Sequence, residues 1–388
     1  MEYQKKELPD KVKNAGFLFA GIGMLLIAVS YILDPRREAF NNIIGLTFFA
    51  SIAIGALALV ALEYISGAVW SVPFRRVSEF IASSLPLVLV FAIPLFLMLG
   101  MLFHWTHPEV VTADKLLSGK SPYLNIPFFI GRTIGVILVL YVFYALFTRN
   151  SRKQDESKEQ GLTRTNVKLS AAFMPVAGIG LTLLSIDWIM SLEPHWYSTI
   201  FGVYYISATL LAGLAATTYA SVSLNEAGYL IPGVNKDHYY SLGALMFAIT
   251  NFWAYIAFSQ FLLIWYANIP EESIWFVMRW EGGWKYISII LIFVRFVIPY
   301  AGLLSQPSKS DPKRLKQISI FILIAHFFDL YWLIMPTFSK TVVFSFYELG
   351  FPLFVVGIVI LAFYYQTKKH NLVAVGDPKL QRGLDFHL

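Results

Sequence analysis

The stretch AGFLFAGIGMLLIAVSYIL, residues 15–33, holds 19 consecutive residues without a charged side chain. A helix needs roughly 20 apolar residues to cross a bilayer core of about 30 Å, so this stretch predicts a membrane-spanning helix. The same criterion finds nine further segments, at residues 43–70, 78–104, 124–148, 169–191, 197–223, 239–267, 285–304, 317–336 and 346–366. A membrane β-barrel would show alternating segments of about ten residues instead. The sequence therefore predicts an all-α polytopic membrane protein with ten transmembrane helices.

The composition of the whole chain agrees with this class. Of the 388 residues, 57% are hydrophobic and only 14% are charged, whereas a soluble domain carries about 25% charged residues. Soluble enzymes and nucleic-acid-binding proteins are excluded on that basis. The chain has no cysteine, so thiolate-held iron–sulfur clusters, c-type haem attachment and disulfides are excluded as well. Any redox centre is therefore expected in a partner chain or in a bound quinone.

Lysine and arginine are distributed unevenly between the two sides of the predicted spans. With the N-terminus on one side, 21 of the 30 positive residues fall on that side and 6 on the other. Positive residues accumulate in cytoplasmic loops, so both termini are predicted to be cytoplasmic, and no cleavable signal peptide is expected. Aromatic residues gather at the predicted outer boundary, where they form either an interfacial belt or a docking surface for an extracytoplasmic partner.

Similar segments recur along the chain and predict an internal repeat. LFTRNSRKQD (residues 146–155) follows the fourth span, and the similar LLSQPSKSDP (residues 303–312) follows the eighth. The unit is four helices, so the two copies run parallel, as in some transporter folds. The predicted division is a cytoplasmic N-terminus (1–14), a peripheral helix and loop (15–42), two four-helix bundles (43–191 and 192–336), a peripheral tenth helix (337–366) and a cytoplasmic tail (367–388).

Ionisable side chains inside spans cost at least roughly 2.5 kcal/mol each, and they usually pair or face the bundle interior. Arg295 and His326 each lie roughly 15 Å below the outer end of their spans, at 1.5 Å per residue. Asp329 follows His326 by one turn on the same helix face. Arg132 and Asp187 occupy the corresponding spans of the first repeat. The complete set of such residues is Glu63, Arg132, Asp187, Arg295, His326, Asp329 and Glu348.

Two interpretations of these charges remain open. Each Arg–Asp pair could be an ion pair that fixes helix packing. Alternatively, the set forms a proton path, with Glu63 at the cytoplasmic entry, His326 and Asp329 as relays near the midplane, and Asp187 and Glu348 at the outer exit. His326 has no second histidine at its depth, so a haem held by two histidines is not expected. A quinol site near the outer surface would draw on Asp187, Arg132 or His195.

Two long strings carry a resemblance to a known family. DWIMSLEPHWYSTIFGVYYISATLLAGLA (residues 187–215) and SLGALMFAITNFWAYIAFSQFLLIWYANIPEE (residues 241–272) resemble the ActF subunits of alternative complex III. These subunits belong to the NrfD-like, or polysulfide-reductase membrane-subunit, family. The ten-span layout is similar along nearly the whole chain. The family core of two four-helix bundles matches the repeat.

The resemblance implies a cofactor-free, non-catalytic membrane subunit of a respiratory quinol:cytochrome c oxidoreductase in the bacterial inner membrane, with a proton-translocation path through its bundles. The implied partners are a sister NrfD-like subunit (ActC), periplasmic iron–sulfur and multihaem cytochrome subunits, and a terminal oxidase. Menaquinol, haem c and iron–sulfur clusters would belong to those partners. The alternatives are a subunit that itself binds quinol and a stand-alone ion-coupled transporter.

Overall fold

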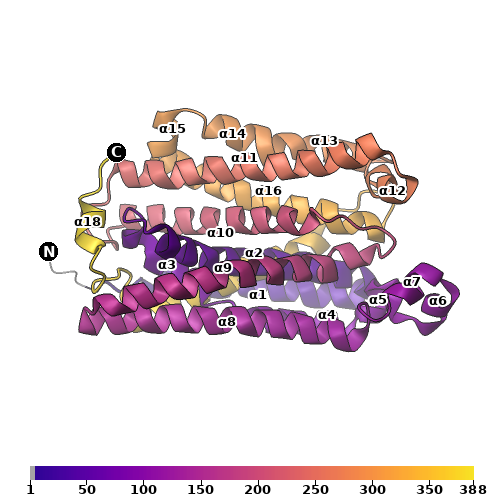
Figure 1. The fold of residues 1–388 in the computed structure, drawn as a ribbon, viewed down its shortest axis with the longest axis horizontal. Helices are drawn as coiled ribbons and strands as arrows, with labels where there is room; N and C mark the ends of the chain where they lie inside the picture. The colour runs from indigo at the N-terminus through magenta and orange to yellow at the C-terminus, as the bar shows by residue number, and fades with distance from the viewer. Residues whose placement is uncertain (1–4) are drawn as a thin grey trace.

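The computed structural model describes residues 5–388, and within this range the chain is 80% helical and contains no strand (Figure 1). Ten segments are long and apolar enough to span a membrane. They are α1 (Asp10–Leu33), α2 (Pro35–Ser66), η1–α4 (Val72–Leu97), α8 (Ile126–Ser157), α9 (Gln160–Trp188), α10 (Phe201–Glu226), α11 (Lys236–Ala267), α13–α14 (Trp284–Gly302), α16 (Pro312–Phe338) and η5–α17 (Phe346–Lys369). The predicted all-α fold with ten spans is confirmed, and the protein is a multi-pass membrane protein.

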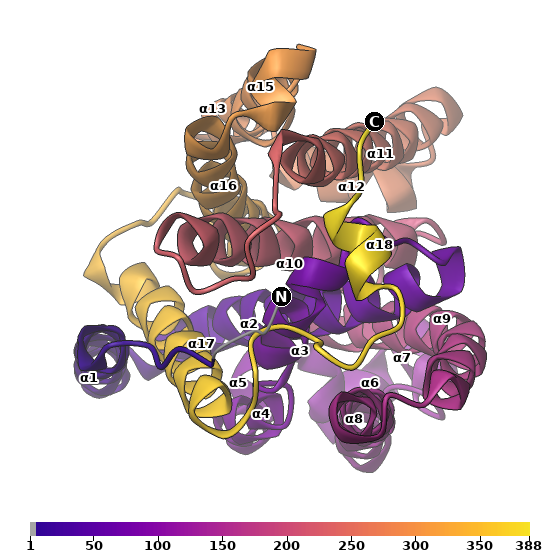
Figure 2. The same ribbon diagram turned by 90° about the vertical axis from the view of Figure 1, so that its left-hand side faces the viewer.

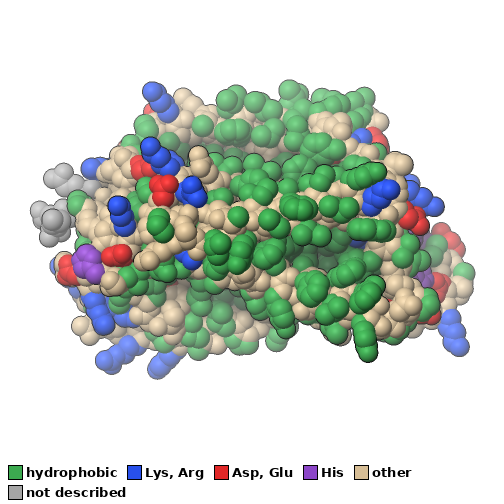
Figure 3. Space-filling view, turned by 90° about the horizontal axis from the view of Figure 1, so that it is seen from above, with side chains coloured by type: hydrophobic (Ala, Val, Ile, Leu, Met, Phe, Trp, Pro, Cys, Tyr) green, Lys and Arg blue, Asp and Glu red, His purple; other side chains and the backbone are tan. Residues whose placement is uncertain are grey.

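The surface around the middle of the bundle is hydrophobic, as expected for a surface in contact with lipid. Large hydrophobic side chains cover the middle in Figure 3, while Lys, Arg, Asp and Glu gather at both ends. Ile32 is 82% exposed and Leu97 is 81% exposed, which would be costly against water but is neutral against lipid. The end that holds residue 5 and the C-terminus is called the terminal end below, and the other is called the opposite end (Figure 1).

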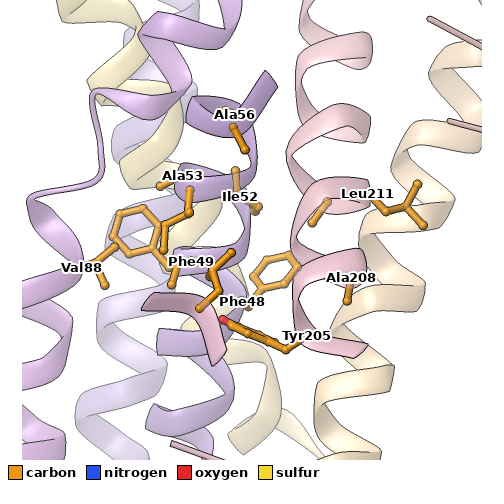
Figure 4. Close-up of a cluster of buried hydrophobic side chains, with 14 of the residues drawn as sticks. Phe48, Phe49, Ile52, Ala53, Ala56, Val88, Tyr205, Ala208 and Leu211 are labelled. Carbon is orange, nitrogen blue, oxygen red and sulfur yellow. The ribbon is translucent and has the colours of Figure 1, made fainter. Parts of the chain in front are cut away.

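Helix α2 lies at the centre, and α10 packs along it (Figure 2). Their backbones touch at Gly55 and Gly213: a Cβ added to Gly55 would lie 2.1 Å from the carbonyl oxygen of Thr209. Small residues allow this close approach between membrane helices. Toward the opposite end a cluster of buried side chains surrounds α2 and α10, and it includes Phe48, Phe49, Ile52, Tyr205 and Leu211 (Figure 4). Helix α1 packs mainly against α17 at one edge of the bundle.

Several helix boundaries differ from the prediction. The expected loop at 34–42 does not exist, because Asp34 alone links α1 to α2. Its side chain caps α2 by accepting from the amide of Arg37 at 3.0 Å, and Pro35 occupies the first turn. Helices α8 and α9 extend well beyond the expected spans, so most of the predicted 149–168 loop is helical.

The third and eighth spans are interrupted. The third consists of α3 (Arg75–Ala82) and α4 (Leu87–Leu97), with a turn at Ser83–Pro86 between them. The eighth consists of α13 (Trp284–Ile292), a π-helix η4 (Phe293–Val297) and α14 (Ile298–Gly302). Pro299 lacks the amide that would bond the carbonyl of Arg295 four residues earlier, which favours the wider π-turn there.

Short helices lie at the two ends of the bundle, as connections between spans, as the first turns of spans, or in the C-terminal tail. At the opposite end they are α5 (Leu99–Leu102), η2 (His104–Thr106), α6 (Pro108–Ala113), α7 (Lys115–Lys120), η3 (Met190–Leu192), α12 (Pro270–Met278) and η5 (Phe346–Leu349). At the terminal end they are η1 (Val72–Phe74), α15 (Gln306–Ser310) and α18 (Leu380–Leu384). The C-terminal tail that carries α18 crosses the terminal end (Figure 2) and buries Leu372 and Val373.

Candidate functional site

Four buried side chains meet between α10, η4 and α16, and they are called the core cluster. The guanidinium Nε of Arg295 lies 3.5 Å from Oδ2 of Asp329, and its Nη2 lies 3.2 Å from Nδ1 of His326. The Tyr204 hydroxyl donates to Oδ1 of Asp329 at 2.5 Å. All four residues are buried. The predicted meeting of Arg295 with His326 and Asp329 is confirmed, and Tyr204 is added to it.

The π-helix η4 presents Arg295 to this cluster. Single π-turns inside α-helices are frequent at functional sites because they redirect a side chain without ending the helix. The Arg295 guanidinium also lies 4.7 Å from the ring centroid of Trp253 on α11, in the range of a cation–π contact. Elements α10, α11, η4 and α16 therefore all contribute to the cluster.

Hydrogen bonding in the core cluster is incomplete. Arg295 Nε, Asp329 Oδ2 and His326 Nε2 are buried and make no hydrogen bond within residues 5–388. An ion pair at 3.5 Å is long, and a buried polar atom without a hydrogen bond is costly. Because the ion pair in this cluster is long and some polar atoms are unbonded, small side-chain movements can transfer a proton from one member to another. A pair in which every polar atom is bonded lacks this freedom.

The first Arg–Asp pair is formed as well, with different geometry. Arg132 on α8 holds Asp187 on α9 through two bonds, Nε to Oδ2 at 2.7 Å and Nη2 to Oδ1 at 3.0 Å. Its guanidinium stacks 3.8 Å from the ring centroid of Tyr123. Next to this pair, the Trp188 indole donates to Thr133 at 3.1 Å and ties the same two helices. Both carboxylate oxygens of Asp187 are occupied, which suits a clamp between helices.

Glu63 is paired with an arginine that the span pattern did not reveal. Arg75 on α3 lies 2.9 Å from Glu63 and 2.7 Å from Asp377 in the tail. Arg75 was assigned to the 71–77 loop, but it is buried in a helix. Six charged side chains at the terminal end form one network of ion pairs, called the terminal network. Its members are Glu63, Arg75, Arg76, Glu79, Asp155 and Asp377.

Glu348 is also held by a partner that the sequence did not reveal. Arg37 bonds both of its carboxylate oxygens at 2.8 Å, and Glu348 caps the backbone at Ser345. The neighbouring Glu38 is fully buried and accepts from Asn41 at 3.1 Å. Sequence reasoning missed Arg37 and Glu38 because it placed them in a loop that is in fact the first turn of α2.

Arg279, beyond α12, is a third buried arginine that the sequence did not single out. It contacts no carboxylate in residues 5–388; instead it donates to the carbonyls of Trp332 and Leu333 on α16, at 3.2 Å and 2.6 Å. Pro336 cannot supply the helical donor for the Trp332 carbonyl, so Arg279 replaces it. Burial lowers the pKa of Arg279 to about 9. The pairing of Pro336 with a distant arginine leaves no local sequence signal.

At the opposite end, His195 lies 2.5 Å from Asp114, which caps α7. That hydrogen bond, together with those from the α7 amides, lowers the pKa of the Asp114 carboxyl. The three residues on which an outer quinol site would draw, Asp187, Arg132 and His195, are thus all engaged with protein partners. Residues 5–388 bring together no group of three His, Asp or Glu side chains able to hold a metal ion.

The structure joins only some of the predicted path. Glu63, Asp187 and Glu348 each lie in a separate ion-pair group and contact no member of the core cluster. Hydroxyl side chains in the spans could also pass protons, but Thr182, Ser185 and Ser207 bond carbonyls of their own helices. Tyr205 bonds the carbonyl of Thr47 on α2 at 3.0 Å. Only Tyr204 reaches the core cluster.

Comparison with known proteins adds no family assignment: no protein-family model matches the chain, and no curated protein gives a significant match.

Proposed function

We propose that this protein is a membrane subunit of a quinol-oxidising respiratory complex in the bacterial inner membrane, and that it conducts protons through its core cluster. The subunit would be of the ActF, NrfD-like type, with haem c and iron–sulfur clusters in periplasmic partner subunits and a sister NrfD-like subunit beside it. Menaquinol oxidation would take place in those partners. The terminal end then faces the cytoplasm, as the distribution of Lys and Arg indicates.

The observation that carries the proton-conducting role is the core cluster itself. A histidine and an aspartate contact one arginine in the interior of the bundle, at a π-turn, and a tyrosine donates to the aspartate. Intramembrane ionisable groups are costly and commonly mark ion or proton pathways. The contacts of Asp329 are shared and partly long, which supports a relay rather than a packing element.

The complex is tested by purification. The affinity-tagged chain, extracted from its native membranes in mild detergent, should carry partner polypeptides with the absorption bands of c-type haem. Extraction alone or as a homo-oligomer without haem would instead favour a stand-alone ion-coupled transporter. A tagged copy of an unrelated ten-span transporter from the same cells controls for haem proteins that adhere nonspecifically.

The proton role is tested separately, in vesicles that contain the purified protein with whatever partners it retains. Asp329→Asn should abolish proton movement that the unmodified protein supports, while haem and partner content stay unchanged. Loss of partners together with proton movement would show that Asp329 serves assembly. Unchanged proton movement would reject the core cluster as the route.

A further inference from the structure

A cavity of about 270 Å³ opens at the terminal end between the central helix α2 and its neighbours α3, α10 and α11. Its polar base is formed by Glu63 and Arg75, with the hydroxyls of Ser71 and Ser78 beside them. The remaining lining is mostly apolar and comes from Leu59, Leu62, Trp70, Leu214, Leu242 and Leu245, among others. The cavity therefore combines a small hydrogen-bonding base with hydrophobic walls.

The exposure of the rim shows how a ligand would enter. Leu59, Leu62 and Leu245 are partly exposed, and all three belong to spanning helices, α2 and α11. The cavity also reaches the water-facing end, where Ser66 is exposed, and the tail lies beside that end with Lys379 bonded to the carbonyl of Gly67 at 3.2 Å. Access through the apolar side of the bundle suits a molecule dissolved in the membrane.

The charge of the base restricts the head group. Arg75 is shared by Glu63, Glu79 and Asp377, at 2.9, 3.6 and 2.7 Å. The terminal network contains two arginines and four carboxylates, so it offers no unpaired positive charge. An anionic phosphate would meet excess negative charge there. An uncharged head whose oxygen accepts a hydrogen bond from a guanidinium or hydroxyl fits this base.

The size of the cavity sets a further limit. Pockets for whole drug-sized ligands occupy about 300–1,000 Å³, so a cavity of about 270 Å³ holds a head group of about one ring but not an entire lipid. The attached chain would leave along the leucines of the rim. We propose that this cavity binds the head group of an uncharged amphiphile, whose apolar chain extends into the bilayer past Leu59, Leu62 and Leu245.

Two membrane components share this chemistry, a lipid-soluble quinone and an uncharged diacylglycerol. The binding site is independent of the proposed respiratory function, since it rests on the cavity and its charges. It also lies at the other end of the molecule from Asp187, Arg132 and His195.

Trp70 in the cavity wall provides the measurement. The purified full-length protein in detergent is titrated with decyl-substituted benzoquinone, with brominated diacylglycerol, and with brominated phosphatidylglycerol, each of which quenches tryptophan fluorescence on contact. The quinone, the diacylglycerol or both should give saturable quenching that Trp70→Phe removes. Saturation by one probe alone identifies the source of the ligand.

Leu245→Phe should narrow the mouth and weaken the saturable binding by about tenfold, equivalent to about 1.4 kcal/mol. Leu262→Phe is the matched control, since Leu262 is exposed on the same helix and does not line the cavity. The affinity of this variant for the probe should stay within about twofold of that of the unmodified protein. Equal saturation by phosphatidylglycerol would overturn the charge argument. The proposed binding site would be wrong if the quenching did not saturate. It would also be wrong if Leu245→Phe and Leu262→Phe changed the quenching equally.

Discussion

The two Arg–Asp pairs use the same residue types on helices at corresponding places in the sequence, yet they bind in opposite ways. Arg132 and Asp187 form two short, parallel bonds, and the arginine retains 13% side-chain exposure. Arg295 and Asp329 are completely buried and meet only at 3.5 Å. Each of the latter two has a second partner, His326 for the arginine and Tyr204 for the aspartate.

Under the proposed function, the difference separates a pair that holds helices together from a pair that exchanges protons. A carboxylate with both oxygens committed to one guanidinium gains geometric specificity but has little freedom to accept a proton. A carboxylate shared between a phenol and a distant guanidinium has lost part of its ion-pair energy but can exchange partners. We therefore expect the first pair to dominate stability and the second to dominate transport.

The largest effect is expected for transport at the second pair. Asp329→Asn keeps the size of the side chain but removes its ionisable group, so proton movement in vesicles should fall by about 10²-fold or more. Asp187→Asn should leave the rate within about twofold, because its partner Arg132 belongs to the clamp. A pH-sensitive dye inside the vesicles measures both rates, and equal losses would erase the functional distinction between the pairs.

Stability should respond in the reverse order. Arg132→Met strips both oxygens of Asp187 of their arginine partner and should lower the free energy of unfolding by about 3–5 kcal/mol. Arg295→Met leaves Asp329 bonded to Tyr204 and should cost less, about 1–3 kcal/mol. Denaturant titration in detergent, followed by circular dichroism, gives both values. A larger loss at Arg295 would mean that the long ion pair carries more energy than its geometry suggests.

Arg279 is a buried arginine without an acid partner, and it can be compared with the two Arg–Asp pairs. Arg279→Met leaves the Trp332 and Leu333 carbonyls without their donors and should destabilise by about 1–3 kcal/mol. In a Pro336→Ala background the helix can satisfy the Trp332 carbonyl itself, so the same substitution should cost about 1 kcal/mol less. The double-mutant cycle reads this coupling directly. Additive effects would show that the arginine does not replace the missing amide.

The smallest effect belongs to the exposed pair Asp114–His195. The pKa of Asp114 is lowered in the folded protein, so its contribution is complete above the ordinary value of about 3.9. That contribution is lost as pH falls through the lowered value. Protease cutting in the 107–123 segment should therefore increase only at strongly acidic pH. In Asp114→Ala cutting should already be raised at pH 7, and identical profiles would contradict the capping role.

Depth along a helix was enough to predict which buried charges meet. Arg295, His326 and Asp329 lie at similar levels on spans adjacent in sequence, and the same argument found Arg132 with Asp187. It failed where a partner lies in a segment read as a loop: Arg75 for Glu63, and Arg37 for Glu348. Hydropathy marks a span only where it is apolar, so charged first turns such as Pro35–Asn42 are read as connections.

The broken spans show a second limit. A proline inside a span, such as Pro86 or Pro299, indicates a local kink. The separation of α3 from α4 and the π-turn at Arg295 depend in addition on neighbouring helices that satisfy the released backbone groups. The sequence could not assign Tyr204 to the core cluster either. Tyr204 and Tyr205 are adjacent and equivalent in the sequence, but only Tyr204 faces the cluster, while Tyr205 faces α2. The two four-helix bundles and the respiratory role remain predictions.

The tail that crosses the terminal end has a consequence for biosynthesis. Asp377 follows Arg75 by roughly 300 residues, which take about 15–60 s to synthesise at about 5–20 residues per second. Until then Arg75 has the nearby acids Glu63 and Glu79 as partners, and Asp155 at the end of α8 lacks the bond that it later accepts from the Gly376 amide. The tail therefore docks on the terminal end late, after the spans have inserted. A chain with a shortened tail would insert into the membrane but leave the terminal end incompletely folded, and quality-control proteases would degrade it.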